Sequence, residues 1–287
     1  NRAREGGVTT MQILPGSANL IGGRGVTLKN VPSESMQAMK FPDAPYGLKM
    51  ACGENPKSLY GSRSELPMTR MGNMAGYRQA FIEATEYKRA WDKYEADYAA
   101  GKNAAAPKRD LTLDTLKGVL EGEILIHNHC YKAEEMVMMI DLGKEFNYHS
   151  GTFHHAIEAY KIADTLAENG NCAAMWPDWW GFKLEAYDMV LENVAIVDSV
   201  KNSCAVVHSD SPVTIQRVNQ ESAKIMHNAN ANGFNYTEEQ AISWITVNAA
   251  KSLGIADKTG SLSVGKNADV VIWNVNPFSV YAKAEQV

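Results

Sequence analysis

Five of the seven histidines in this chain follow or end short apolar runs, and four of these five come in two close pairs. They are His127, His129, His154, His155 and His208. A lone histidine in an apolar run is usually a core side chain. Several neutral imidazoles accompanied by carboxylates are instead the ligand set that a borderline metal such as Zn²⁺ selects. If the runs are neighbouring parallel strands, these side chains converge, and the pattern predicts a metal site.

Asp210 adds a carboxylate directly after the last of these runs, in His-Ser-Asp-Ser-Pro. One interpretation makes it the N-cap of a helix predicted over 215–230. A cap normally lies immediately before the first helical turn, and Asp210 comes several residues too early. We therefore expect Asp210 to have a catalytic role as an acid–base group.

Lys49 is the unusual residue of the apolar run Gly47–Cys52. Strand alternation places it on one face with Ala51, opposite Leu48 and Met50. A lysine in a buried strand is unfavourable unless it is paired or chemically altered. Glu54, just past the run, could form an ion pair with Lys49 or could itself ligate a metal, and the residues alone leave both open.

The elements that position these side chains alternate between strands and helices along the chain. We predict strands at Val8–Leu14, Val26–Lys29, Gly47–Cys52, Ile124–His129, Tyr148–His155, Ala173–Trp176 and Cys204–Asp210. We predict helices at Arg70–Ala99, Ala133–Phe146, Ala156–Asn169, Phe182–Val197, Ile215–Asn230 and Glu238–Leu253. This alternation indicates an α/β fold with a parallel sheet, whose site lies at the carboxyl ends of the strands.

Residues 70–105 are predicted to form a helical insertion or lid within a barrel domain of residues 1–256. Tyr87, Trp91, Tyr94 and Tyr98 form a stripe at helical spacing, which we expect to pack on the body of the domain. The segment 257–287 alternates turns and short strand-like runs, and it predicts part of a small β-sandwich.

Composition excludes several classes of protein. The chain has 287 residues, 45% of them hydrophobic and 21% charged, with a net charge of −5. The acidic balance argues against general nucleic-acid binding, and no apolar run approaches the roughly 20 residues of a membrane helix. The four cysteines lack a CxxC spacing and are predicted to be buried thiols. Cellular compartment is not predicted, and a homo-oligomer remains open.

The ordered motifs resemble a known family. They are Leu-Lys-Met-Ala at Lys49, Ile-His-Asn-His at His127, Phe-His-His-Ala at His155 and His-Ser-Asp-Ser-Pro at Asp210. This order is similar to the metal-dependent amidohydrolases of the imidazolonepropionase-like and prolidase-like branch. The segment from Asn248 to the turn–strand pattern around 260–272 also resembles that superfamily's passage from barrel to β-sandwich. The resemblance implies a (β/α)8 TIM-barrel-type fold.

The resemblance also implies roles for the motif residues. His127 and His155 would be metal ligands, and Asp210 would be both a metal ligand and the general base. Lys49 would be carboxylated and bridge two metals, although other branches use a glutamate, which makes Glu54 a competitor. The implied cofactor is a divalent metal, with zinc expected, as one or two ions in the full-length enzyme.

The implied reaction is hydrolysis of an amide, peptide or cyclic-amide C–N bond in a small molecule by a metal-activated water. His129 would contact the substrate carbonyl as a catalytic residue. The residues expected to line the substrate pocket are His154, His208, Trp176, Asp178, Trp179 and Trp180.

The chain departs from the family pattern at its beginning. The His-x-His of the first barrel strand is missing, and Val8–Leu14 corresponds to the second strand. We therefore expect a piece of a longer enzyme with an impaired metal site and a barrel that lacks strand 1. A partner chain or further residues would cover the resulting gap. Two alternatives remain: a metal-free enzyme using the histidines for acid–base or lyase chemistry, and a non-catalytic degenerate barrel acting as a binding or scaffold module.

Overall fold

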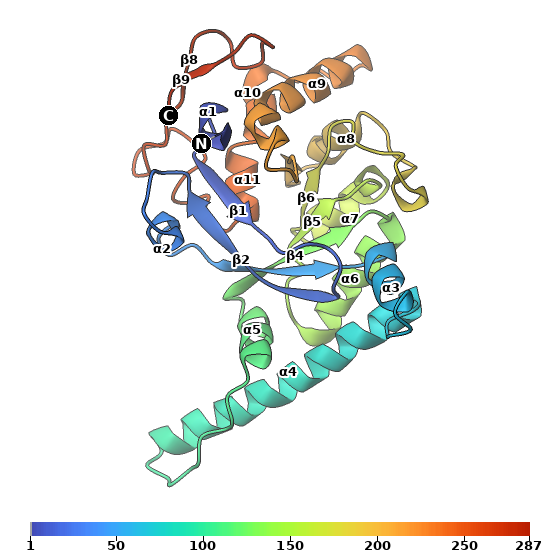
Figure 1. Ribbon diagram of the computed structural model, residues 1–287, viewed down its shortest axis with the longest axis vertical. Coiled ribbons are helices and arrows are strands. Elements are labelled where there is room, and N and C mark those ends of the chain that lie inside the picture. The colour runs from blue at the N-terminus through green and yellow to red at the C-terminus, as the bar shows by residue number, and fades with distance from the viewer. Residues whose placement is uncertain (1) are drawn as a thin grey trace.

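A curled seven-stranded sheet forms the centre of the protein, whose computed structural model describes residues 2–287 (Figure 1). Its strands are adjacent in sequence order, from β1 to β7. Their bounds are β1 Thr10–Ile13, β2 Ile21–Lys29, β3 Tyr46–Ala51, β4 Ile124–Cys130, β5 Thr152–His155, β6 Cys172–Met175 and β7 Ala205–Val207. Strands β3 to β7 are parallel, as predicted, and this arrangement brings their carboxyl ends to one edge.

The first two strands differ from the prediction of a wholly parallel sheet. β1 pairs antiparallel with β2, and β2 pairs antiparallel with β3. A parallel pair needs a crossover of a dozen or more residues, usually a helix. Residues 14–20 are too few for one, and residues 30–45 contain only the short helix α2, Met36–Met39. The sheet is open, with β1 and β7 at its edges.

Helices follow the parallel strands and lie outside the curled sheet (Figure 1). The α-helices beyond α2 are α1 Arg2–Glu5, α3 Glu54–Gly61, α4 Arg70–Ala99, α5 Leu111–Leu120, α6 Ala133–Phe146, α7 Ala163–Glu168, α8 Asn193–Ser199, α9 Val218–Ala231, α10 Glu238–Ser243 and α11 Val247–Ser252. The 3₁₀ helices are η1 Ala159–Ile162, η2 Leu184–Ala186 and η3 Thr214–Arg217. Leu48 and Met50 of β3 belong to the main apolar core, whereas Lys49 faces the other side, as strand alternation requires.

Helix α4 has the predicted bounds but does not form a lid. Its part up to Tyr87 buries Tyr77, Phe81 and Tyr87 itself against the body. Residues 88–99 of the helix are not buried, and this end projects beyond the sheet, away from α3 and the carboxyl end of β3 (Figure 1). Of the aromatic stripe, Tyr87 contacts α5, where its hydroxyl donates to Asp114 over 2.6 Å. The other three aromatics pack on one another along this arm.

Two predicted helices are interrupted. Residues 182–192 contain only the short turn η2, and the regular helix begins at Asn193 rather than at Phe182. The helix predicted over Glu238–Leu253 divides into α10 and α11, because Trp244 turns inward and is fully buried between them. Tertiary contacts override helical periodicity in both places.

The four cysteines are buried, as predicted, but they are not free thiols. Cys52 is paired with Cys130, and Cys172 with Cys204. Each disulfide connects neighbouring strands or their flanking residues, because adjacent parallel strands bring the paired positions together. A sequence without a CxxC motif gave no sign of this pairing.

The carboxyl-terminal segment contains a two-stranded antiparallel sheet. Its strands are β8, Ile272–Trp273, and β9, Ala284–Gln286. Within residues 2–287, no helix has both the length and the apolar character needed to cross a membrane.

Candidate metal and catalytic site

The five histidines converge at the carboxyl edge of the parallel strands. In the sheet register, His129 of β4 lies opposite His154 of β5. Nδ1 of His127 lies 2.9 Å from Nε2 of His154. The rings of His129 and His155 are 4.6 Å apart between centroids, and His208, just after β7, lies 5.2 Å from His155. The predicted convergence is therefore present in the fold.

Burial keeps these imidazoles neutral. It lowers the pKa of His127 and of His208 to about 3, and the ammonium of Lys49 adds to the effect in both cases. Burial likewise lowers the pKa values of His129, His154 and His155. A neutral imidazole has a lone pair available for a metal or for a hydrogen bond.

Several of the buried imidazole nitrogens have no hydrogen-bond partner within residues 2–287. They are both ring nitrogens of His129, Nδ1 of His155 and Nε2 of His208. A buried polar atom without a partner is unfavourable and needs an explanation, such as a bound water or ion. Since the same donors suit a borderline divalent metal, the chemistry of this set fits zinc.

His127 is arranged less favourably for metal binding. Its Nε2 lies 3.0 Å from the side-chain amide nitrogen of Gln12 in β1, and its Nδ1 faces His154. Across residues 2–287, no three His, Cys, Asp or Glu side chains are grouped as ligands around one point. The donor set is thus present without a preformed coordination cage.

Asp210 lies beside the histidine cluster in a left-handed backbone conformation, with φ of 53°. Its Oδ2 is 3.8 Å from Nδ1 of His155. It does not cap the next helix, because Ser211 Oγ accepts the backbone N–H groups of Val213 and Thr214 instead. Partial burial raises the pKa of Asp210, and Lys49 acts in the opposite direction.

Lys49 points into the same region from β3. Its ammonium donates to the carbonyl of Pro15 over 3.3 Å, and burial lowers its pKa while Asp210 opposes the shift. In the described chain, Lys49 and Glu54 form no ion pair, so Lys49 remains a buried cation near the histidines. Glu54 is the first residue of α3, and its backbone N–H donates to Oε1 of Glu185 over 2.9 Å.

An aromatic wall adjoins the histidines, and it contains part of the predicted pocket lining. Trp176 stacks on His155 at 4.2 Å and on His208 at 5.7 Å between ring centroids. Trp179 packs on Trp176 at 4.8 Å. We define the aromatic wall as Tyr131, Trp176, Trp179 and Phe182.

Two predicted lining residues lie elsewhere. Asp178 forms an ion pair with Lys224 over 2.8 Å, with both side chains about half exposed. Trp180 is 41% exposed and is not part of the aromatic wall.

The sequence analysis did not predict three residues of this region, which are Tyr131, Lys183 and Glu185. Tyr131 is 4% exposed, and its ring lies 4.5 Å from that of His129. Burial raises its pKa, as do Glu185, Asp210 and Glu54, so the phenol stays protonated and can donate a hydrogen bond. The i, i+2, i+4 spacing of His127, His129 and Tyr131 was a signal that could have found it.

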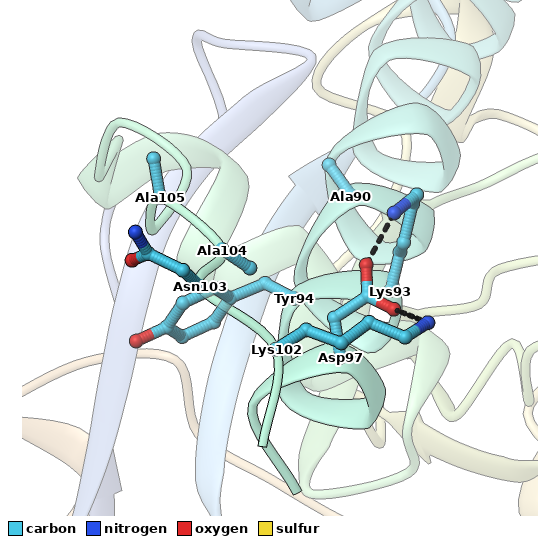
Figure 2. Close-up of a pocket in the computed structure, with 8 residues that line it drawn as sticks. All are labelled: Ala90, Lys93, Tyr94, Asp97, Lys102, Asn103, Ala104 and Ala105. Atoms are coloured by element: carbon cyan, nitrogen blue, oxygen red, sulfur yellow. Dashed lines mark hydrogen bonds and ion pairs between the residues drawn. The ribbon is translucent and has the colours of Figure 1, made fainter. Parts of the chain in front are cut away.

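Two surface hollows of the molecule have no histidine in their lining. One of about 360 Å³ is at the tip of the α4 arm, where Lys93 and Lys102 flank Asp97 beside Tyr94 (Figure 2). Both lysines pair with the Asp97 carboxylate, so each ammonium already has a partner within the hollow. A second, of about 70 Å³, lies between Cys52, Arg70 and Glu135.

Comparison with known proteins assigns the chain to a family. A sequence profile of the Amidohydrolase family matches residues 208–286, which include Asp210 and the β8–β9 segment. The crystal structure of an amidohydrolase from Thermotoga maritima MSB8 superimposes with a TM-score of 0.85 and 34% identity, covering 99% of this chain and 71% of that one. The chain belongs to the amidohydrolase family.

Curated relatives of this amidohydrolase-family chain agree with that assignment. Amidohydrolase tasK from Hapsidospora irregularis is 31% identical over 301 residues, which are 99% of this chain but 30% of that protein. An imidazolonepropionase from Shewanella oneidensis is 50% identical over 54 residues, or 19% of this chain and 13% of the enzyme. The matched segments therefore cover less than a third of the length of each of these two relatives.

The family and the curled α/β sheet were both predicted correctly, including the resemblance to the imidazolonepropionase-like branch. The Thermotoga structure supports the barrel-type fold of the amidohydrolases for this sheet.

Proposed function

We propose that this chain carries the site of a metal-dependent hydrolase that cleaves amide, peptide or cyclic-amide C–N bonds in small molecules. The observation that supports it best is the group of buried, neutral imidazoles beside Asp210 at the carboxyl edge of the sheet. Membership of the amidohydrolase family agrees with hydrolytic chemistry.

The proposed metal ligands are His127, His155 and Asp210, with Lys49 in carboxylated form or Glu54 as a further ligand, because an ammonium has no lone pair for a metal. A divalent metal such as zinc, when bound, supplies Lewis-acid polarisation and a water of lowered pKa. His127 would have to give up its contact with Gln12 to take part. The unpartnered nitrogens of His129, His155 and His208 support a bound ion at this position.

The chain's own groups would handle the protons. Asp210, as the ionised general base, would accept a proton from the attacking water and deliver it to the leaving nitrogen. His129 and the protonated phenol of Tyr131 lie beside each other and could both donate hydrogen bonds to the substrate carbonyl oxygen. Such donors stabilise the negative charge that develops on that oxygen.

A substrate screen tests the proposal. The purified chain, supplied with zinc, would be incubated with N-acyl amino acids, dipeptides and cyclic amides, and the released amine would be measured. We expect turnover with at least one class, and we expect Asp210→Asn to reduce kcat/KM by about 10²–10⁴-fold, since it removes the base. Circular dichroism would verify that the variant folds.

Two outcomes would count against it. Equal turnover by wild type and Asp210→Asn would remove the proposed base from the mechanism. Absence of turnover, with substrates bound but unchanged, would favour a non-catalytic binding module, which the engagement of both ring nitrogens of His127 also favours.

A further inference from the structure

Lys183 places a cation at the rim of the aromatic wall. Its ammonium lies 4.3 Å from the centre of the Tyr131 ring, and that ring is 4.5 Å from the ring of His129. Lys183 belongs to the irregular segment between β6 and α8, where its side chain is 22% exposed. A ligand that reaches His129 from this side would therefore pass the ammonium.

Within the described chain, the ammonium of Lys183 donates one hydrogen bond, so it has further N–H donors for a ligand. An ammonium has three donors. One donates to Oδ1 of Asn55 over 2.6 Å. The nearest carboxylate oxygen, Oε2 of Glu185, is 3.6 Å away, beyond hydrogen-bond distance, and it has no partner within the described chain.

Glu185 is instead committed to other groups. Its Oε1 accepts from the backbone N–H of Glu54 over 2.9 Å and from Arg70 over 3.2 Å. This buried carboxylate thus holds the start of α3 and the start of α4 through Oε1, while its Oε2 forms an ion pair with Lys183 at 3.6 Å without a hydrogen bond. Lys49, the other cation near the histidines, is 4% exposed and donates to Pro15.

Exposed aromatic side chains continue outward from the same point. Phe182 lies 6.3 Å from Tyr131 and 5.8 Å from Trp179 between ring centroids. Trp179 and Phe182 are each 51% exposed, and because they adjoin one another they form a contiguous exposed apolar surface rather than isolated side chains. A cation and an apolar surface therefore meet within one short segment.

We propose that Lys183 binds the free carboxylate of the substrate while Trp179 and Phe182 pack on the side chain next to that carboxylate. The substrate class is then an N-acyl amino acid or dipeptide whose C-terminal residue is aromatic or large and apolar. A free carboxylate on the carbon next to the cleaved amide nitrogen distinguishes this class from cyclic amides and heterocycles that lack it. This inference rests on the proposed hydrolase function and specifies its substrate.

Paired substrates test the role of Lys183. The kinetics of N-acetylphenylalanine would be compared with those of N-acetylphenylalanine amide, which lacks the charge. We expect Lys183→Met to raise KM for the carboxylate about 10–100-fold, because hydrogen bonds to charged groups contribute roughly 1.5–3 kcal/mol. KM for the amide and kcat for both would stay within about twofold, and Lys183→Arg would restore most of the loss.

Lys224→Met is the matched control, because Lys224 pairs with Asp178 of the same segment but lies outside the aromatic wall. It should leave both KM values unchanged. An equal change for the acid and the amide in Lys183→Met, or no change for either, would overturn the carboxylate assignment.

A binding titration separates failure of this inference from failure of the proposed function. Quenching of tryptophan fluorescence by N-acetyl-D-phenylalanine and by its amide measures recognition without hydrolysis. Lys183-dependent preference for the acid, in the absence of any turnover, would support the carboxylate site and contradict the hydrolase. Turnover without that preference, or no binding of either probe, would contradict the carboxylate site.

Discussion

Glu135 is a buried carboxylate beside Arg70 at the edge of the site, and its Oε1 lies 2.5 Å from the Arg70 Nε. Its pKa is nevertheless raised to about 7, because burial and the nearby Glu185 outweigh the guanidinium. A carboxyl group whose pKa is higher in the folded state makes folding less favourable as the pH rises from its unfolded pKa to its folded pKa. Glu135 should therefore reduce stability progressively between about pH 4.5 and pH 7.

Replacement of this carboxyl group should remove that pH dependence. We expect Glu135→Gln to match wild type near pH 5 and to be more stable above pH 7 by on the order of 2 kcal/mol. Urea denaturation of both proteins at pH 5, 6, 7 and 8 measures the difference. A constant difference across this range would show that Glu135 has an ordinary pKa.

At the scale of single residues, the sequence was informative where chemistry and strand alternation coincided. His127, His129, His155 and Asp210 were predicted because each follows or ends an apolar run, and the fold brings them together. Lys183 was missed because its segment has helical periodicity. Its position depends instead on contacts with Asn55 and Tyr131, which lie far away in sequence.

At the scale of elements, α4 combines two different environments in one helix. Phe81 in its first half is fully buried and stacks on Tyr148 at 4.4 Å and packs on Phe146 at 5.6 Å. Tyr98 near its end is 70% exposed. The bounds of this helix followed from its periodicity, but periodicity could not show that the second half leaves the body.

Two substitutions distinguish the halves of α4. Phe81→Ala should destabilise the protein by about 3–5 kcal/mol, because it leaves a cavity in the main core. Tyr98→Ala should change the free energy of unfolding by less than about 0.5 kcal/mol, as expected for an exposed side chain. Comparable losses in chemical denaturation of the two variants would mean that the arm is packed against something.

At the scale of the whole molecule, the two disulfides connect parts of the sheet that are distant in sequence. A thiol assay in 6 M guanidinium without reductant should find no free cysteine, and four after reduction. Each bond should contribute roughly 2–4 kcal/mol by restricting the unfolded chain. Free thiols in the unreduced, denatured chain would contradict the pairing.

The sheet also shows that the pattern of apolar runs predicts the positions of the strands but not their directions. All seven predicted strands exist, but their direction depends on the connections between them. The short connection 14–20 makes β1 and β2 antiparallel, whereas the helical connections after β3 make the remaining strands parallel. The predicted site residues lie on the parallel part, so the error in the direction of β1 and β2 does not affect their convergence.

Metal dependence of amide hydrolysis is the central claim. The chain would be assayed with an N-acyl amino acid before treatment with a strong chelator, after complete metal removal, and after zinc is restored, with bound zinc quantified at each step. We predict that turnover disappears with the metal and returns as zinc binds, and that His155→Ala retains less zinc than wild type. Undiminished turnover by the metal-free chain would contradict the account.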